Sequence, residues 1–240
     1  MQLSARGFEC AWASDRQPVA LRAWSWQLRH RPPGAVWSPH GGRQLMREPL
    51  GGAGPHSGSQ RGLEVQIREL ERPEIHDIWS IDRAEVVDKV YYRVGKALVL
   101  KSEHHDVKGW PPGEPERDGP ILLDCFDHGG TFYGAFDGKI LIGATMLESR
   151  FIGRERDQLQ LKFLHVSRRH RRAGLGCMLF DKAVAKAREL GARRLYISAT
   201  PSENTVRFYL RRGCRVTDDV DTALFKLEPE DIHLEFGIPV

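Results

Sequence analysis

The feature that most constrains this fold is a glycine turn between a β-strand and an amphipathic helix. Residues 159–166 alternate apolar and polar side chains, as a half-buried strand does. Residues 175–190 place apolar side chains on one helical stripe, and Gly191 follows as a stop signal. Between these two segments stands Arg171-x-x-Gly174-x-Gly176. Small residues at a helix start let backbone N–H groups converge, so the turn indicates a phosphate or pyrophosphate site.

Residue types at this turn exclude two other phosphate loops. A Walker loop needs a lysine and a Ser or Thr after its second glycine, and neither is present. A dinucleotide fingerprint needs a third glycine where this chain has Leu179. The basic run 168–172 could by itself be a nucleic-acid patch, although most charge runs are solvated surface.

The other signals alternate between strands and helices. We expect strands at residues 63–70, 131–136, 139–152, 159–166, 194–199 and 232–236, and helices at 71–90, 175–190 and 202–212. Asp137-Gly138 is a tight hairpin turn, and a small hairpin around Gly95-Lys96 is expected over 91–101. Residues 104–118 are interpreted as a loop, and 121–127 are ambiguous. This order predicts a mixed α/β layer fold.

The charge of the chain is concentrated at one end. The formal net charge of +4 comes entirely from residues 1–45, which hold six arginines and two acids. An Arg-rich targeting peptide and a nucleic-acid arm are alternatives, but we favour an unselected extension and interpret Met46 as a better start. Residues 1–61 are therefore predicted to be a disordered extension and linker, and residues 62–240 the working domain. Removing residues 1–45 should leave ligand binding intact.

The composition excludes several other classes of protein. No apolar run is long enough for a conventional transmembrane helix. The four cysteines are scattered without a Cys-x-x-Cys pair, so neither a disulfide framework nor a metal site is indicated. Reduced thiols favour a cytoplasmic location. Because the net charge of residues 46–240 is zero, we expect neither nucleic acid nor a membrane as a partner.

Two motifs in order carry a family resemblance. The strand ending at Val166, the turn Arg171-x-x-Gly174-x-Gly176 and the helix after it resemble the acyl-CoA motif of the GNAT acetyltransferase superfamily. Downstream, Phe208-Tyr209-x-x-x-Gly213 resembles that family's second motif. The resemblance covers about residues 63–236. It implies a central, mostly antiparallel twisted sheet flanked by helices, with acetyl-CoA as co-substrate and an amine as acceptor.

The resemblance assigns roles residue by residue. In the family, the strand before the loop hydrogen-bonds the pantetheine arm, which maps to Leu164, His165 and Val166. The loop amides hold the pyrophosphate, which maps to Arg171, Arg172, Ala173, Gly174, Leu175, Gly176 and Cys177. The tyrosine protonates the departing thiolate, which maps to Tyr209.

The chain also departs from the family pattern. The asparagine usual seven residues before the tyrosine is Ser202 here, and Asn204 is the nearest candidate to contact the cofactor. The aromatic residue usual after the glycine is Cys214. The glutamate that many members carry on the strand 159–166 is absent, since this strand offers Gln160 and Lys162.

The chemistry follows from direct attack of an amine on a thioester. The amine must lose a proton, and a backbone N–H near residues 164–166 would stabilise the oxyanion. The base stays open between His165, Glu148 on the hairpin strand, and a water relay. His104, His105, Asp127 and His128 lie in segments that could form the acceptor pocket.

Three functions remain to be compared. The first is an N-acetyltransferase acting on a small-molecule or peptide amine, and a homodimer is considered as its assembly. The second is an acyl-CoA-binding module of the same fold without turnover, which the missing strand glutamate keeps open. The third, a nucleic-acid binder, is disfavoured by the neutral charge balance of residues 46–240.

Overall fold

A computed structural model describes residues 65–239. The N-terminal extension predicted at residues 1–61 lies outside these described residues, as does the beginning of the first expected strand.

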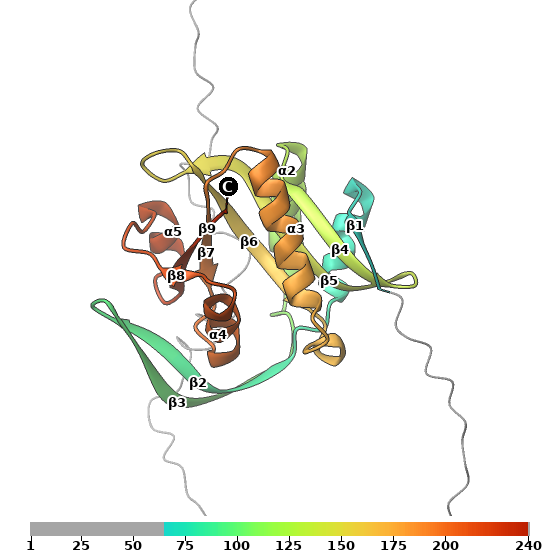
Figure 1. Ribbon diagram of the computed structural model, residues 1–240. Helices are drawn as coiled ribbons and strands as arrows, with labels where there is room; N and C mark the ends of the chain where they lie inside the picture. The colour runs from blue at the N-terminus through green and yellow to red at the C-terminus, as the bar shows by residue number, and fades with distance from the viewer. Residues whose placement is uncertain (1–64, 240) are drawn as a thin grey trace, which may run out of the picture.

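A seven-stranded sheet organises the molecule, in the order β1-β4-β5-β6-β7-β9-β8 (Figure 1). The strands are β1 (Val65–Glu69), β4 (Thr131–Asp137), β5 (Ile140–Ile152), β6 (Gln158–Val166), β7 (Arg194–Ala199), β8 (Arg215–Val216) and β9 (Ile232–Gly237). Neighbouring strands of this sheet run antiparallel except β6 and β7, which are parallel. The predicted mixed fold with a mostly antiparallel sheet is confirmed.

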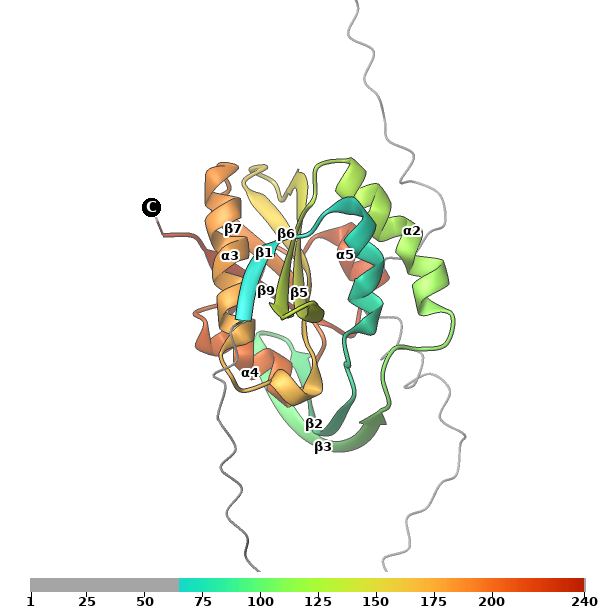
Figure 2. The same cartoon turned by 90° about the vertical axis from the view of Figure 1, so that its right-hand side faces the viewer.

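Helices cover both faces of the sheet (Figure 2). On one face lies α3 (Leu175–Glu189), the amphipathic helix predicted from the sequence. On the opposite face lie η1 (Arg72–Ser80), a 3-10 helix, and α2 (Glu114–Asp127). The two larger cores lie on opposite faces of the sheet: Leu159, Leu161, Phe180, Ala183 and Leu195 pack under α3, and Ile75, Ile78, Leu122, Phe132 and Met146 pack under η1 and α2.

The alternation of β7 and β9 makes one face of the sheet apolar and the other polar. Ile197 and Leu234 belong to the core under α3. On the other face the Tyr196 hydroxyl donates to His233 Nδ1 at 2.8 Å, and the Ser198 hydroxyl lies 3.4 Å from the same atom. Helix α5 (Thr222–Leu227) covers this polar face, since its Phe225 ring contacts the His233 ring at 5.6 Å.

The helix expected over residues 71–90 is wrong in its second half. Only η1 is helical, and β2 (Glu85–Val94) pairs with β3 (Ala97–Val107) in a separate two-stranded sheet. The turn lies at Gly95-Lys96 as predicted, and Gly95 has φ +60°. The hairpin is longer than predicted because β-branched and aromatic residues of β2 find strand partners in β3, and this pairing overrides their helical spacing.

The loop expected over residues 104–118 is also wrong. Residues 104–107 finish β3, and α2 begins at Glu114 directly after Gly113, whose φ is +76°. A proline in the first turn of a helix loses no hydrogen bond, so Pro115 starts this helix where it suggested a loop. The ambiguous segment 121–127 is the second half of α2. The short β8 and α5 were not predicted.

The hairpin of β2 and β3 packs against α4 (Glu203–Arg211), as Figure 1 shows. The Tyr91 N–H donates to the Pro201 carbonyl at 2.7 Å, and Val90 forms a β-bridge with Ser202. Ser202 is also the N-cap of α4, since its hydroxyl accepts from the Thr205 N–H at 3.3 Å, which confirms the predicted cap. The hairpin of β2 and β3 is therefore held beside the N-terminus of α4.

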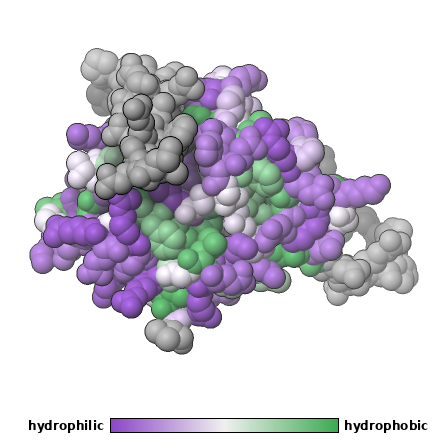
Figure 3. Space-filling model, turned by 90° about the horizontal axis from the view of Figure 1, so that it is seen from above, coloured by the Kyte–Doolittle hydropathy of each residue, from purple (hydrophilic) through white to green (hydrophobic). Residues whose placement is uncertain are grey.

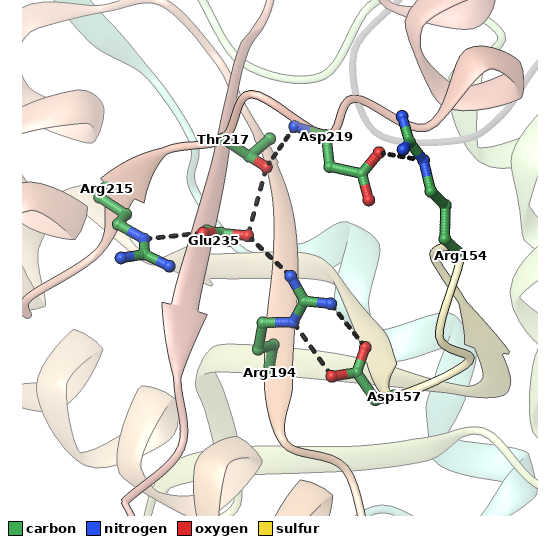
Figure 4. A network of polar contacts seen from close by, with 7 residues as sticks. All are labelled: Arg154, Asp157, Arg194, Arg215, Thr217, Asp219 and Glu235. Carbon is green, nitrogen blue, oxygen red and sulfur yellow. Dashed lines mark hydrogen bonds and ion pairs between the residues drawn. The ribbon is translucent and has the colours of Figure 1, made fainter.

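A network of charges fixes the end of the fold where β6 meets β7 (Figure 4). Arg194 donates to both carboxylate oxygens of Asp157, at 2.8 and 3.1 Å, and contacts Glu235 at 3.4 Å. Glu235 also accepts from Arg215 at 2.7 Å and from Thr217 at 3.2 Å. Because these residues come from β7, β8, β9 and the turn before β6, the network holds the strands at a fixed spacing.

The visible surface is mostly hydrophilic when the molecule is seen from above, with hydrophobic residues between the polar ones (Figure 3). Within residues 65–239, no helix is long and apolar enough to cross a membrane.

Candidate active site

Strands β6 and β7 form a fork. They pair only where Gln158–Gln160 lie beside Arg194–Tyr196, and beyond this point they separate. A β-bulge contributes, because Leu161 pairs with Leu147 and Phe163 pairs with Met146, which leaves Lys162 as an extra residue on β6. A cleft of about 780 Å³ opens between the separated strands. Its two walls are residues 161–166 of β6 and residues 198–200 at the end of β7.

The N-terminus of α3 opens into this cleft. Gly174 is the N-cap residue with φ +84°, and its side-chain position offers no capping group. The first helical hydrogen bond runs from Met178 N–H to the Gly174 carbonyl at 3.1 Å, so the preceding amides have no partner within the helix. Gly176 and Cys177 line the cleft at this point. The arrangement is suited to an anion, since unpaired N–H groups and the helix dipole act together.

Six arginines line the same cleft: Arg83, Arg168, Arg171, Arg172, Arg211 and Arg212. They come from the segment before β2, from the loop before α3 and from α4. Arg171 also has a structural role, because its Nε donates to the Val166 carbonyl at 2.9 Å and its Nη1 to the Ala84 carbonyl at 3.1 Å. The Arg171 side chain thus connects the end of β6 to the start of the β2–β3 hairpin. The combined positive charge of the six arginines favours a polyanionic ligand.

Helix α4 supplies Tyr209 to the floor of the cleft. The residue is 6% exposed, and its hydroxyl makes no hydrogen bond to any residue in the described part of the chain. Burial raises the pKa of Tyr209, with smaller contributions from Cys214 and Asp231. The phenol therefore keeps its proton and is available as a donor. Asn204, one turn earlier in α4, donates from Nδ2 to Glu85 Oε1 at 2.9 Å.

His165 lies in an aromatic environment on the β6 wall. Its ring centroid is 4.5 Å from that of Phe163 and 5.3 Å from that of Trp110. Desolvation, together with the charges of Arg83 and Arg171, lowers the pKa of His165 well below its usual value. The imidazole is therefore neutral at neutral pH, and it holds a proton only weakly once it accepts one.

Glu148 lies behind the cleft wall. Lys162 donates to Glu148 Oε1 at 2.5 Å, and the Cys125 thiol donates to Oε2 at 3.2 Å. Lys162 lines the cleft, whereas Glu148 does not. Both carboxylate oxygens of Glu148 thus have partners on the side away from the cleft lining.

The fold brings most of the predicted site residues together. The cleft is lined by Leu164, His165, Val166, Arg171, Arg172, Gly174, Gly176, Cys177, Asn204 and Tyr209. Ala173 is exposed, and the Leu175 side chain is buried in a small core under α3. His104 and His105 lie on β3, while Asp127 and His128 lie at the end of α2. None of these last four residues lines the cleft.

Sequence reasoning missed two groups of buried charges. Arg83 and Glu114 lie 3.7 Å apart with side chains 5% and 0% exposed, and Arg83 lines the cleft. Glu228 and Asp231 are each 8% exposed beneath the polar face of β7 and β9. Arg83 fell inside the helix expected over residues 71–90, and Glu114 fell inside the loop expected over 104–118. Glu228 and Asp231 fell between the expected helix 202–212 and the expected strand 232–236. The acidic segment 228–231 directly before a strand was the available signal. Among the described residues, no cluster of His, Cys, Asp and Glu could hold a metal ion.

Comparison with known families shows which proteins this chain is similar to. Residues 98–214 match the model of the Acetyltransferase (GNAT) family. No curated protein matches the sequence. The family match begins within β3 and ends just after α4, so it includes the fork, the glycine turn and Tyr209.

Solved structures share the fold at low sequence identity. A nourseothricin acetyltransferase is 20% identical with a TM-score of 0.54, covering 73% of this chain and 99% of that one. A protein of Bacillus anthracis strain Ames, solved with acetyl coenzyme A, is 16% identical with a TM-score of 0.51, covering 75% and 100%. N-acetylglutamate synthase of Neisseria gonorrhoeae, solved with coenzyme A and N-acetylglutamate, is 19% identical with a TM-score of 0.51, covering 73% and 35%.

Proposed function

We propose that this chain, whose residues 98–214 match the model of the Acetyltransferase (GNAT) family, transfers an acetyl group from acetyl-CoA to an amine by direct attack. One observation carries the proposal: the fork between β6 and β7 joins an anion site at the α3 N-terminus to a buried, protonated tyrosine. The fork is thus suited to a ligand with an anionic end and a reactive thioester end.

The residues of the cleft fit acetyl-CoA. The uncapped amides of α3 and the arginines of the loop would hold the pyrophosphate. The β6 wall, Leu164 to Val166, has no strand partner on the β7 side, so its backbone groups there are available to the pantetheine arm, except the Val166 carbonyl that Arg171 already bonds. Acetyl-CoA supplies the acetyl group as a thioester, and every other function in the site comes from this chain.

Tyr209 is assigned as the acid. The amine attacks the carbonyl carbon, a backbone N–H of the bulged β6 strand stabilises the oxyanion, and Tyr209 donates its proton to the sulfur as it leaves. His165 is neutral and lines the cleft, so it can accept a hydrogen bond from the acceptor. Glu148 acts only through Lys162, because that ion pair separates it from the cleft.

Two measurements test the proposal. Isothermal titration with acetyl-CoA is expected to show one binding site per chain, and free-thiol release is expected to depend on an added amine. The acceptor panel consists of ethanolamine, 1,3-diaminopropane, glycinamide and a tripeptide with a free N-terminus. Failure to bind acetyl-CoA would overturn both the transferase and the module without turnover. Binding without thiol release from any acceptor would favour the latter, a non-catalytic acyl-CoA-binding protein.

A further inference from the structure

A buried arginine, Arg83, lines the cleft with an incomplete set of polar partners. Its side chain is 5% exposed, and its Nη1 has no hydrogen-bond partner among the described residues. An ion pair joins this Nη1 to Glu114 Oε2 at 3.7 Å, and neither oxygen of Glu114 has a hydrogen bond within residues 65–239. A guanidinium keeps its proton in a protein. Because a buried charge is costly unless it is paired and hydrogen-bonded, the Arg83 site lacks a partner.

Neither neighbouring carboxylate fully compensates the charge of Arg83. The 3.7 Å separation from Glu114 is longer than a hydrogen bond. Desolvation raises the pKa of Glu114 to about 7, so a large share of this carboxyl is neutral at neutral pH. A second acid that acts on Arg83 is Glu85. The Glu85 carboxylate already accepts from Asn204 at 2.9 Å and lies 3.9 Å from Arg171. The Arg83 guanidinium is therefore left to attract a further anion.

Trp110 holds the guanidinium in a fixed orientation. The Arg83 Cζ lies 4.8 Å from the centre of the Trp110 ring, and Trp110 Nε1 donates to the Ile81 carbonyl at 2.9 Å. A guanidinium is planar, and its N–H groups form a rigid fork that matches the two oxygens of one carboxylate. A single guanidinium carries one charge, as a carboxylate does. The site is therefore better suited to a carboxylate than to a phosphate dianion.

Arg83 lies on the face of the sheet opposite α3. Its partner Glu114 begins α2, and Trp110 packs against the core under η1 and α2, which cover that face (Figure 2). The pyrophosphate site proposed above is at the N-terminus of α3, on the other face. Acetyl-CoA held there would enter the fork from the α3 side. The opposite side of the fork, with Arg83, is then left for the acceptor.

His165 shares this side of the fork with Arg83. Its ring centroid is 5.3 Å from that of Trp110, so His165 and Arg83 lie against the same indole side chain. Both residues line the cleft. His165 is the residue proposed above to accept a hydrogen bond from the acceptor. An amine beside His165 and an anionic group at Arg83 therefore fit two ends of one small molecule.

We propose that Arg83 binds the carboxylate of the acetyl acceptor, so that the acceptor is an amino acid. The proposal rests on the acetyl transfer proposed above and specifies its substrate class. The carboxylate accepts N–H bonds from the Arg83 guanidinium, and the amine of the same molecule faces the thioester in the fork. An uncharged amine of the same length leaves the buried guanidinium without this partner and is a poorer substrate.

The first test compares amino acids with their own amides. Free-thiol release is measured at saturating acetyl-CoA with glycine, β-alanine and γ-aminobutyrate, each against its amide at an equal concentration of neutral amine. For at least one chain length, kcat/KM is expected to be at least about 10-fold higher for the acid than for its amide. Aminomethylphosphonate is added as a phosphate-like acceptor. A preference for it over every carboxylate would overturn the carboxylate assignment.

Substitution of Arg83 tests whether this side chain causes the preference. Arg83→Met should raise KM for the preferred acid by about 10- to 100-fold. Its kcat should change little, because the carboxylate contact is the same before and during the reaction. The acid-to-amide ratio of kcat/KM should therefore fall to about 1, whereas a merely structural role would lower both values alike. Arg83→Lys keeps the charge but loses the planar fork, so it should give an intermediate ratio.

The matched control is Arg211→Met, because Arg211 is an arginine of the same cleft that lies on α4. It should leave the acid-to-amide ratio unchanged. If Arg83→Met fails to fold, the double variant Arg83→Met/Glu114→Gln removes both members of the buried pair, and the same ratio is measured in it.

The possible results are distinguishable. Thiol release in the wild type that is no faster with any acid than with its amide would overturn the carboxylate site and leave the acetyl transfer intact. A preference that persists in Arg83→Met or in the double variant would do the same, as would an unchanged ratio in Arg83→Lys. Absence of thiol release with every amino acid, every amide and the panel above would overturn the acetyl transfer and the carboxylate site together.

Discussion

Position, rather than acidity, is what suits Tyr209 to the proposed acid role, since an ordinary phenol is already protonated at neutral pH and burial raises the pKa of Tyr209 further. The hydroxyl faces a cleft but has no partner in the described part of the chain, and the pKa of Tyr209 is raised. In the proposed reaction, the leaving sulfur is the acceptor that this unpartnered hydroxyl meets. The sequence placed Tyr209 on a helix before a glycine, but its burial is a property of the packed fold.

Replacing Tyr209 with phenylalanine is expected to lower kcat by about 100-fold, since the thiolate would leave without a proton. The acetyl-CoA Kd should change little, because the ring still packs against Phe180 and Phe208. Free-thiol release measures the first quantity and calorimetry the second. The control is Tyr133→Phe, because the Tyr133 hydroxyl of β4 donates to Glu69 of β1, near the other edge of the sheet. Unchanged turnover in Tyr209→Phe would remove the residue from the mechanism.

Gly174 has a backbone conformation that other residues rarely adopt. Its φ is +84°, and a Cβ there would meet nothing within 4 Å. Gly191, at the other end of α3, has φ +86° and equally open surroundings. Alanine at either position should therefore introduce similar backbone strain, and only Gly174 adjoins the cleft.

We expect Gly174→Ala and Gly191→Ala each to lower the free energy of unfolding by about 1 kcal/mol. Only Gly174→Ala should weaken acetyl-CoA binding, because its strain displaces the amides that hold the pyrophosphate. Urea denaturation and calorimetry on both variants check this. Equal Kd values for the two variants would show that the Gly174 turn has no part in binding.

At the scale of elements, the fork forms because β6 and β7 are paired at one end and separated at the other. The Arg194–Asp157 pair and its bonds to Glu235 fix the closed end (Figure 4), and the bulge at Lys162 opens the other end. The strands themselves were predictable from alternating side chains. The bulge was not, because it is defined by the register between β5 and β6, which a single strand's pattern does not contain.

Asp157→Ala should lower the free energy of unfolding by about 2 kcal/mol, since it leaves the Arg194 guanidinium without its bidentate partner in a partly buried site. Arg154→Ala is the contrasting change in the same network. Arg154 is 86% exposed and pairs with Asp219, and exposed pairs contribute little. Chemical denaturation of both variants compares the two positions. A smaller loss for Asp157→Ala than for Arg154→Ala would contradict this account of the closed end.

For the whole molecule, buried acids predict a dependence of stability on pH. Desolvation raises the pKa of Glu114 to about 7 against the opposing charge of Arg83. The folded protein therefore binds this proton more tightly than the unfolded chain, in which the pKa is about 4.5. The stability from this proton is fully present below pH 4.5, and it is lost as the pH rises through 7.

The wild type should lose up to about 3 kcal/mol of its free energy of unfolding between pH 5 and pH 7.5 through Glu114. Glu114→Gln removes this group, so the variant should show a smaller fall over the same interval while the contribution of Glu228 remains. Urea denaturation at both pH values measures the difference. Parallel pH dependence of the two proteins would show that Glu114 does not hold the proton.

The sequence by itself determined the elements that repeat a simple pattern and the turn that joins two of them. The Asp137-Gly138 turn defined the hairpin of β4 and β5, alternation indicated β6, a single stripe defined α3, and two glycines after a basic run predicted an anion site. These are local properties, because neighbours three or four residues apart specify them. The N-cap Ser202 was predictable for the same reason.

Tertiary structure alone decided the rest. It turned the expected helix over residues 85–90 into a strand, because β3 supplies partners that no local signal contains. It also separated β6 from β7 and buried Glu228, where desolvation raises the pKa of a carboxyl that looks ordinary in the sequence. Register, burial and pKa depend on residues far apart in the chain, and for this reason the candidate acid Tyr209 could be named from the sequence while the buried carboxyls of Glu114 and Glu228 could not.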